Sequence, residues 1–332
     1  MPAEHSTVRA DMGPGLVMLP GEGEDLWLSH GEGVRASIKI SPENFPVNIV
    51  AFGTLTLPAG TSFGEPNYHR GDVLYFVETG VGEATLDGVR HDIAQGSTVY
   101  VGRMTRHAFR NRGPGELRLT WTNLPPGPER LLRRLGKPVA GPAPAAFTEE
   151  ERAAAEALAD WYGGPRELRG MAHSKGVSLV IDPEGGASYW QPEPTGGYVT
   201  VKLSPYNLPT NMFAFGIQQV GPGGLLPSHS HSRNEELKYV WDGAGQATVN
   251  GETVRAAPGT TVFTGRWVEH EFRADDAGPM TITWLIFPAG LENVLTGIGR
   301  ERDPADRHPG AFDLPGNLMD MLDEAGFGPV TL

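Results

Sequence analysis

Hydrophobic and polar residues alternate in short runs along most of this chain. The segments "EATLDGVRH" (83–91) and "QATVNGETV" (246–254) are typical, with β-prone residues on both sides of Asp-Gly or Asn-Gly. Alternation with a period of two places successive side chains on opposite faces of a strand, and these dipeptides favour a two-residue hairpin turn. Short strands at this spacing predict an all-β sandwich or small barrel.

The same pattern occurs twice. The segment "VKLSPYNLPTNMFAFG" (201–216) repeats "IKISPENFPVNIVAFG" (38–53) 163 positions later. This offset holds without a gap over most of the chain and pairs Leu16 with Leu179, Trp27 with Trp190, Gly80 with Gly243, His107 with His270, and Trp121 with Trp284. A single register of this length indicates a duplicated domain.

Two segments depart from the alternation. "FTEEERAAAEALADWYGG" (147–164) predicts a helix, because Thr148 can cap its start and Glu151 stands three residues further on. "NLMDMLDEAGFG" (317–328) predicts a shorter helix. We therefore expect four parts: an N-terminal barrel in residues 1–145, a linker helix in 146–165, a C-terminal barrel in 166–300, and a tail with a short helix in 301–332.

Composition narrows the class of protein. The 332 residues carry a net charge of −13 without a Lys/Arg cluster, which argues against a nucleic-acid or anionic-membrane surface. The absence of cysteine excludes disulfides, thiol catalysis and thiolate metal sites. The sequence has neither an apolar signal core nor a run long enough to span a membrane, so we expect a cytoplasmic protein.

The segment "LPSHSHSRNEELKYVWDG" (226–243) contains candidate metal ligands. His229 and His231 share one face of a strand, and Glu236 lies beyond the turn-like "SRNE" at the start of the next strand. His270 follows in a later strand pair. Imidazoles and a carboxylate suit a divalent ion such as Fe(II), Mn(II), Ni(II), Co(II) or Zn(II), and leave coordination positions open for substrate or water.

These residues resemble the cupin superfamily. The spacing HxHxxxxE, then six residues and Gly243, then "PGTTVFTGRWVEHEF" (258–272), is similar to its two motifs. Two fused copies resemble the bicupins, including the quercetin 2,3-dioxygenase-like proteins. The resemblance covers nearly the whole chain and implies two tandem jelly-roll (double-stranded β-helix) barrels. It also implies that one metal ion is bound in the second barrel by His229, His231, Glu236 and His270. The alternative is a hydrogen-bonded polar strand without a metal.

The first copy lacks this ligand set. The offset aligns His229 with Pro66, His231 with Tyr68 and Glu236 with Val73, and it retains only His107 opposite His270. We therefore expect the first barrel to be metal-free. His69 and Asp72 lie one position out of register, so a β-bulge would be needed to bring them to a metal site.

Other differences between the copies suggest a substrate pocket. Lys238 replaces Tyr75 and shares the inward face of Glu236 in a regular strand, although a lysine there could also extend to the barrel mouth. We expect catalytic roles for Glu236 and Lys238. We also expect five residues to line or cap the cavity: Gln218, Gln219, Phe263, Trp267 and Phe272, the last of which could equally be ordinary core.

The function expected from these features is that of a metal-dependent dioxygenase. One divalent ion in the second barrel would bind an enolisable aromatic or polyketide-like small molecule that reacts with O2, and Glu236 would take up a proton. A non-oxidative isomerase, cyclase or decarboxylase is the alternative, and a binding protein without catalysis is a third possibility. We expect a monomer or a homodimer.

Overall fold

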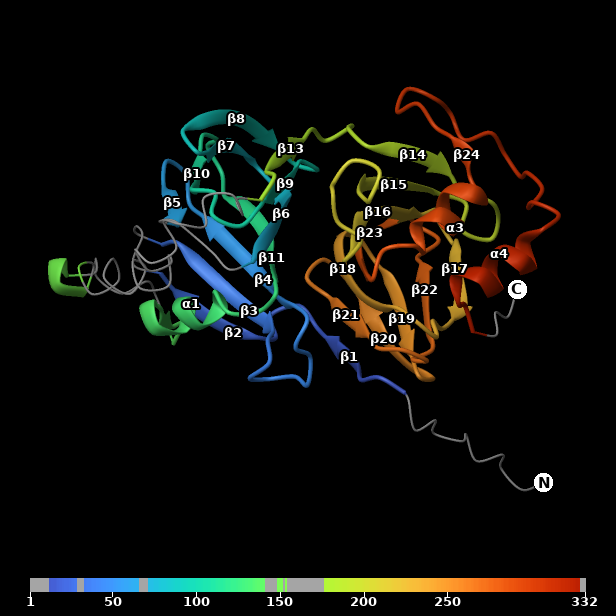
Figure 1. Cartoon of the computed structure of the whole chain (residues 1–332), viewed down its shortest axis with the longest axis horizontal. Coiled ribbons are helices and arrows are strands. Elements are labelled where there is room, and N and C mark those ends of the chain that lie inside the picture. Colours follow the sequence, from blue (N-terminus) through green and yellow to red (C-terminus); the bar gives the residue numbers. More distant parts are fainter. Residues whose placement is uncertain are drawn as a thin grey trace, which may run out of the picture. The chain divides into compact units, whose positions relative to one another are not determined.

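A computed structural model describes residues 12–28, 33–65, 71–140, 148–151, 153 and 176–328 (Figure 1). It divides into two compact units, Glu22–Gly185 and Gly186–Leu332 with Met1–Gly21. Both are built from antiparallel strands, which confirms the all-β class expected from the alternating pattern. Within the described residues, no helix has the length and apolar character needed to cross a membrane.

The first unit contains a large and a small sheet. The eight-stranded sheet has the order β12-β2-β3-β4-β11-β6-β9-β13, and the four-stranded sheet has the order β5-β10-β7-β8. The strands are β2 (Glu24–Trp27), β3 (Arg35–Ile40), β4 (Ala51–Leu57), β5 (Ser62–Glu65), β6 (Asp72–Thr79), β7 (Val81–Leu86), β8 (Val89–Ala94), β9 (Thr98–Val101), β10 (His107–Asn111), β11 (Leu117–Leu124), β12 (Lys137–Pro138) and β13 (Leu179–Ile181). A helix that the sequence pattern did not predict, α1 (Glu129–Leu135), follows β11.

The second unit repeats this plan. Its large sheet has the order β1-β21-β18-β23-β16-β15-β14-β24, and its small sheet has the order β17-β22-β19-β20. The strands are β1 (Gly15–Met18), β14 (Ala187–Trp190), β15 (Tyr198–Leu203), β16 (Ala214–Val220), β17 (Leu225–His229), β18 (Glu235–Gly243), β19 (Gly245–Val249), β20 (Glu252–Ala256), β21 (Thr261–Thr264), β22 (His270–Ala274), β23 (Met280–Phe287) and β24 (Arg300–Glu301).

The hairpin turns match the expectation from sequence. Asp87 and Gly88 join β7 to β8 with φ angles of 50° and 84°. Asn250 and Gly251 join β19 to β20 with φ angles of 50° and 82°. Positive φ at both central residues is the conformation that Asp-Gly and Asn-Gly adopt most easily. These turns set the register of the small sheets.

The first strands of the two copies are exchanged. β1 pairs with β21 in the second unit, whereas β13 pairs with β9 in the first unit. Residues 16–18 and 179–181 are equivalent at the 163-residue offset, so each copy receives its outer strand from the other copy's sequence. The expected boundaries of 1–145 and 166–300 therefore misplace these two strands, because the apolar pattern shows that a segment is a strand and not which sheet it joins.

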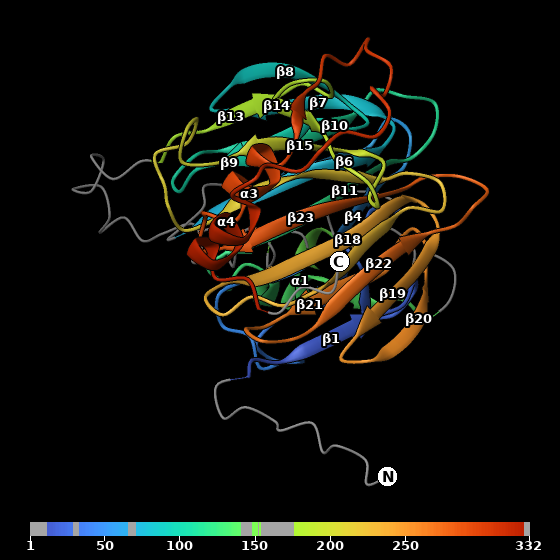
Figure 2. The same ribbon diagram turned by 90° about the vertical axis from the view of Figure 1, so that its right-hand side faces the viewer.

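Two helices accompany the second unit. α3 (Glu292–Gly297) follows β23, and α4 (Leu318–Ala325) lies in the tail where the sequence predicted a helix (Figures 1 and 2). α4 ends at Gly326, which has a φ of 79°, a backbone conformation that favours glycine. The expected helix over 147–164 lies largely outside the described residues. At its start, the Glu151 backbone N–H donates to Thr148 Oγ1, and the Thr148 N–H donates to the Glu151 carboxylate.

Candidate metal centre

The ends of three strands and the loop after β17 bring the candidate ligands together. His229 ends β17 and lies opposite His270, the first residue of β22. His231 follows β17 and forms an isolated bridge with Phe327 of the tail. Glu236 is the second residue of β18. The turn between β17 and β18 therefore places Glu236 on a new strand, as its odd spacing from His231 required.

The ligand atoms of these residues converge in the second unit. One nitrogen from each of the three imidazoles and one Glu236 oxygen all lie within 4.8 Å of one another. Glu236 Oε2 lies 2.9 Å from His270 Nε2 and 3.5 Å from His231 Nε2. All four side chains are buried. Three nitrogens and one oxygen at such separations fit a single divalent transition metal ion.

Backbone carbonyls orient two of the imidazoles. His229 Nδ1 lies 2.7 Å from Pro227 O, and His270 Nδ1 lies 3.0 Å from Val268 O. A carbonyl oxygen only accepts, so Nδ1 carries the proton in both rings. Nε2 is then left as the lone-pair donor, as in most metal-binding histidines. Burial holds the pKa of both histidines well below the usual value, which favours the neutral form that binds metal.

His231 is held differently. Both of its ring nitrogens are buried, and neither has a hydrogen-bond partner within the described residues. Burial again lowers the pKa of this imidazole. A buried polar nitrogen without a partner is costly unless a ligand satisfies it. A metal ion bound by Nε2 would provide a partner for one of the two nitrogens.

Lys238 points inward and is 3% exposed. Its Nζ donates to Glu236 Oε2, lies 3.2 Å from His270 Nε2 and lies 5.9 Å from the centre of the Phe272 ring. Of the two orientations considered from sequence, the structure therefore has the inward one. Burial lowers the pKa of the lysine ammonium well below its usual value.

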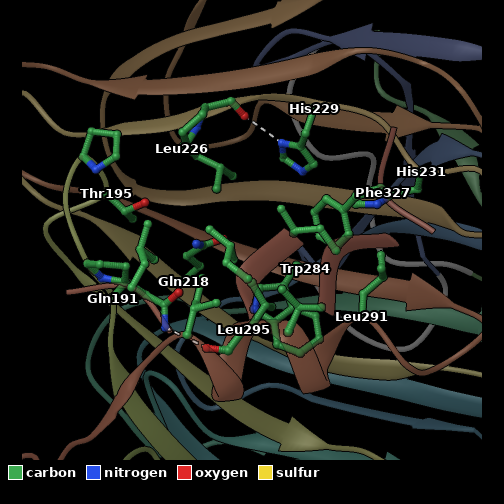
Figure 3. A pocket seen from close by; sticks show the side chains of 18 of the residues that line it. Gln191, Thr195, Gln218, Leu226, His229, His231, Trp284, Leu291, Leu295 and Phe327 are labelled. Atoms are coloured by element: carbon green, nitrogen blue, oxygen red, sulfur yellow. Dashed lines mark hydrogen bonds between the residues drawn. The ribbon is translucent and has the colours of Figure 1, made fainter. Parts of the chain in front are cut away.

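A cavity of about 120 Å³ opens onto the cluster (Figure 3). His229, His231, Glu236 and Lys238 lie on its wall together with Gln218. Most of the remaining wall is apolar and comes from α3, α4 and their surroundings: Leu291, Val294, Leu295, Ile298, Leu314, Leu318, Leu322 and Phe327. Glu193 is a further charged lining residue and is itself exposed. The site is therefore a mainly hydrophobic chamber with a polar inner end.

Strand alternation places the two glutamines expected in the pocket on opposite faces of β16. Gln218 lines the cavity and is 3% exposed, whereas its neighbour Gln219 does not line it. The two residues are successive in β16, so their side chains point to opposite faces. Within the described residues, the Gln218 amide forms no hydrogen bond, and it is free to bind a ligand.

The three expected aromatic residues lie outside the cavity wall. Phe263 pairs with Leu237 and shares its face, whereas Glu236 and Lys238 point the other way. Phe272 belongs to the hydrophobic core beneath Lys238. Trp267 is half-buried and donates its backbone N–H to His231 O at 2.8 Å. Trp267 therefore braces the loop that carries His231.

The apolar wall from the tail was missed by the sequence analysis. α4 was expected as a helix, yet its role in closing the cavity was not recognised. The available signal was the spacing of Leu318 and Leu322, which stand four residues apart and so share one face of α4. Phe327 had no comparable signal, because its contacts depend on how the chain turns after Gly326.

The equivalent positions of the first unit form no such cluster among the described residues. His107 Nε2 lies 2.8 Å from the Tyr75 hydroxyl, where the second unit has His270 and Lys238. Asp72 accepts hydrogen bonds from the Tyr100 hydroxyl and the Arg103 backbone N–H instead of facing inward. Pro66, Tyr68 and His69 lie outside the described residues. The cavity beside Tyr75 measures about 10 Å³, room for no more than one water molecule.

Comparison with known proteins gives matches to both copies. Residues 53–123 and 216–286 each match the family model described as "Cupin domain". Gentisate 1,2 dioxygenase 1 of Aquipseudomonas alcaligenes is 38% identical over 72 residues, which are 21% of this chain and 20% of that relative. The chain thus spans about a fifth of the curated relative it matches.

Solved structures resemble the fold over most of the chain. The putative glyoxylate induced protein from Pseudomonas aeruginosa has a TM-score of 0.58 and 14% identity, and the match covers 86% of this chain and 92% of that one. The formate complex of Lactobacillus farciminis oxalate decarboxylase has a TM-score of 0.58 and 14% identity, with coverage of 86% and 88%. At these identities the likeness concerns the fold alone.

Proposed function

We propose that this chain, which carries two cupin domains in tandem, is a metal-dependent dioxygenase that acts on a small enolisable aromatic compound. The observation that carries the proposal is the buried His229, His231, Glu236 and His270 cluster at the inner end of an apolar cavity. The partial match to a gentisate dioxygenase supports oxygen chemistry on an aromatic ring. One divalent ion per chain is the proposed cofactor, and O2 is the second substrate.

The four ligands leave coordination positions for substrate and oxygen. Fe(II), Mn(II), Ni(II), Co(II) and Zn(II) all accept imidazole and carboxylate ligands. When bound, such an ion would stabilise negative charge on a substrate oxygen. The surrounding apolar wall excludes water and so strengthens this interaction.

The cavity volume restricts the size of the substrate. An engineered cavity of about 150 Å³ in another protein holds one benzene molecule. The space of about 120 Å³ here therefore suits a single ring. A three-ring flavonol or an extended polyketide exceeds this volume and would project beyond the cavity. We propose a monocyclic substrate whose oxygen donors face the cluster and whose ring contacts the apolar wall.

Three side chains on the cavity wall would act on this substrate. The Gln218 amide would bind a polar substituent, because it has no hydrogen-bond partner within the described residues. Glu236 and Lys238 are in direct hydrogen-bond contact, so a proton from a substrate hydroxyl can be held between Glu236 Oε2 and Lys238 Nζ. Both groups lie within the buried site, where bulk water does not compete for that proton.

The same Glu236–Lys238 contact favours a second candidate function. A buried acid–base pair beside a metal ion can move a proton within one substrate, as isomerisation or decarboxylation requires. Such a reaction would proceed without O2. Oxygen dependence therefore separates the two candidates.

We expect the purified protein to bind one metal ion per chain and to consume O2 with monocyclic substrates that have two adjacent oxygen donors. Elemental analysis after anaerobic loading with Fe(II), Mn(II) or Ni(II) measures the number of metal ions per chain. An oxygen electrode measures O2 consumption, and a flavonol serves as a substrate that is too large for the cavity. Substrate turnover under strict anaerobiosis would identify the non-oxidative candidate as correct.

Two variants provide matched controls for the metal count. His270→Ala removes a ligand and should lower metal affinity by more than the roughly 10- to 100-fold typical of losing an outer hydrogen-bond partner. His107→Ala changes the equivalent residue of the first unit and should leave the metal content at one ion per chain. Failure of the wild-type protein to bind any of these ions would refute the proposed function.

A further inference from the structure

We propose that Phe327 is a positioning residue for the metal centre, and that it holds the His231 imidazole in its ligating orientation. This inference rests on the proposed metal site and does not depend on the reaction that the site performs. It assigns a function to the C-terminal tail, which is distant in sequence from the two ligand-bearing motifs. Three features support this role: the backbone hydrogen bonds of the tail, the two glycines beside Phe327, and the contacts of the Phe327 ring.

The tail is joined by hydrogen bonds to the loop that carries His231. The Ser232 backbone N–H donates to Gly326 O at 2.7 Å, and the Gly328 N–H donates to Ser230 O at 2.7 Å. The Ser232 hydroxyl also donates to Gly326 O at 2.8 Å. These bonds flank the bridge between His231 and Phe327. The position of Phe327 is thus tied to that of the ligand itself.

The two glycines beside Phe327 allow this close approach. A Cβ on Gly326 would come within 2.6 Å of Ser232 Oγ, and the residue has a φ of +79° that disfavours other side chains. A Cβ on Gly328 would collide with Ser230 Oγ. The sequence Gly-Phe-Gly therefore brings one aromatic side chain to the loop while keeping the backbone in contact with it.

The Phe327 ring packs against two of the three imidazoles (Figure 3). It lies edge-on to His231, with ring centres 4.6 Å apart and planes at 79°. It is stacked on His229, with centres 5.6 Å apart and planes at 28°. Edge-on and stacked arrangements are the favourable geometries for aromatic rings. One side chain thereby restricts the orientation of two ligands.

His231 depends on this packing more than the other histidines do. His229 and His270 each have a carbonyl that fixes the ring through Nδ1, whereas neither nitrogen of His231 has such a partner within the described residues. Metal ligands without an outer partner lose affinity because the free site samples other orientations. The ring of Phe327 replaces the missing hydrogen bond by steric contact.

The test compares metal binding by Phe327 variants without measuring catalysis. Phe327→Ala should weaken Co(II) binding about tenfold, as loss of an outer-sphere partner does. It should also change the visible d–d spectrum of the Co(II) protein, because a freely rotating His231 alters the coordination geometry. Phe327→Tyr keeps the ring and should restore both the affinity and the spectrum. Phe312→Ala, which removes a tail aromatic that packs on Arg300, is the matched control and should behave like wild type.

Each outcome decides between the alternatives. A Phe327→Ala protein with wild-type Co(II) affinity and spectrum would overturn the positioning role and leave the proposed function standing. Equal losses in Phe327→Ala and Phe312→Ala would overturn it too, because they would reflect general loosening of the tail. If Phe327→Ala does not fold, Phe327→Leu keeps the apolar volume without the flat ring, and the same comparison applies. A wild-type protein that binds no Co(II) overturns both proposals.

Discussion

At the residue scale, His107 and His270 occupy equivalent positions in chemically different surroundings. His270 faces a carboxylate, a lysine and two further imidazoles, whereas His107 Nε2 contacts the Tyr75 hydroxyl. The first copy lacks the residues equivalent to His229, His231 and Glu236, so its remaining histidine is a buried side chain outside any such cluster among the described residues. Burial lowers the pKa of His107 to about 4.

This low pKa predicts acid sensitivity. Between pH 6.5 and about 4 the unfolded chain binds a proton at His107 and the folded chain does not, so the stability of the first unit falls as the pH falls through this window. The loss amounts to about 3 kcal/mol of unfolding free energy at the acid end. Denaturant unfolding of His107→Gln and wild type at pH 7 and pH 4.5 measures it. The variant should lose less stability between the two pH values, and an identical loss would contradict the assignment.

Gln218 and Gln219 provide a second comparison between single residues. Gln218→Leu should lower the preference for substrates with a polar ring substituent by about tenfold, because a buried hydrogen bond to the ligand is lost. Gln219→Leu lies on the other face of β16 and should leave this preference unchanged. Competition between substituted and unsubstituted ring compounds measures the effect. If both variants shift the preference equally, Gln218 does not contact the substituent.

Residue identity predicted the cluster of three histidines and one glutamate better than the cavity wall. The two histidines and the glutamate of β17 and β18 were recognisable because their spacing follows strand geometry over a few positions. Phe263, Trp267 and Phe272 were assigned to the wall on size and proximity in sequence alone. Their actual orientation depends on pairing between distant strands, such as Leu237 with Phe263, which a single sequence does not reveal.

At the scale of elements, the exchanged strands β1 and β13 were the feature hardest to predict. Both were recognisable as short apolar segments, and their equivalence follows from the 163-residue offset. Yet their partners, β21 and β9, belong to the opposite copy. Edge pairing uses backbone groups that are the same in every strand, so the side-chain pattern of β1 is compatible with either sheet.

The exchange predicts that a substitution near the N-terminus affects the second unit. Val17 pairs with Val262 and packs against the hydrophobic core of that unit. Val17→Asp should lower the stability by about 1 kcal/mol, because it replaces a partly buried aliphatic side chain at the core with a charged one. Amide hydrogen exchange should accelerate in β21 and not in β9. The exposed Val89 gives a control, because Val89→Asp should change stability by less than about 0.5 kcal/mol. Faster exchange in β9 alone would place β1 in the other sheet.

For the tail helix, the local sequence predicts the helix and does not predict its contribution to the cavity. α4 was predictable from its apolar spacing and from Gly326 at its end. Its contribution to the cavity, through Leu318 and Leu322, follows only from its position beside α3 and the cluster. A pattern that indicates an amphipathic helix shows that one face is covered without identifying what covers it.

At the scale of the whole molecule, the two copies share one architecture and differ in the side chains at the positions of the His229, His231, Glu236 and His270 cluster. The ungapped repeat made the architecture predictable, because each strand and turn of one copy could be checked against the other. The cluster of candidate ligands could be located in the second copy for the same reason. The size of the cavity and the closing role of the tail could not, since they arise from packing among segments far apart in the chain.

The exchanged strands also limit how this protein can be divided. A gene fragment that begins between the two sequence copies would encode the half with the histidine cluster but without β1. It would also carry β13, whose sheet partner β9 lies in the other half. A minimal version of the second half would have to graft residues 12–21 onto the fragment or supply them as a separate peptide in a complementation experiment. If halves of such duplicated chains were exchanged, the DNA encoding one half would therefore have to come from two separate places in the gene.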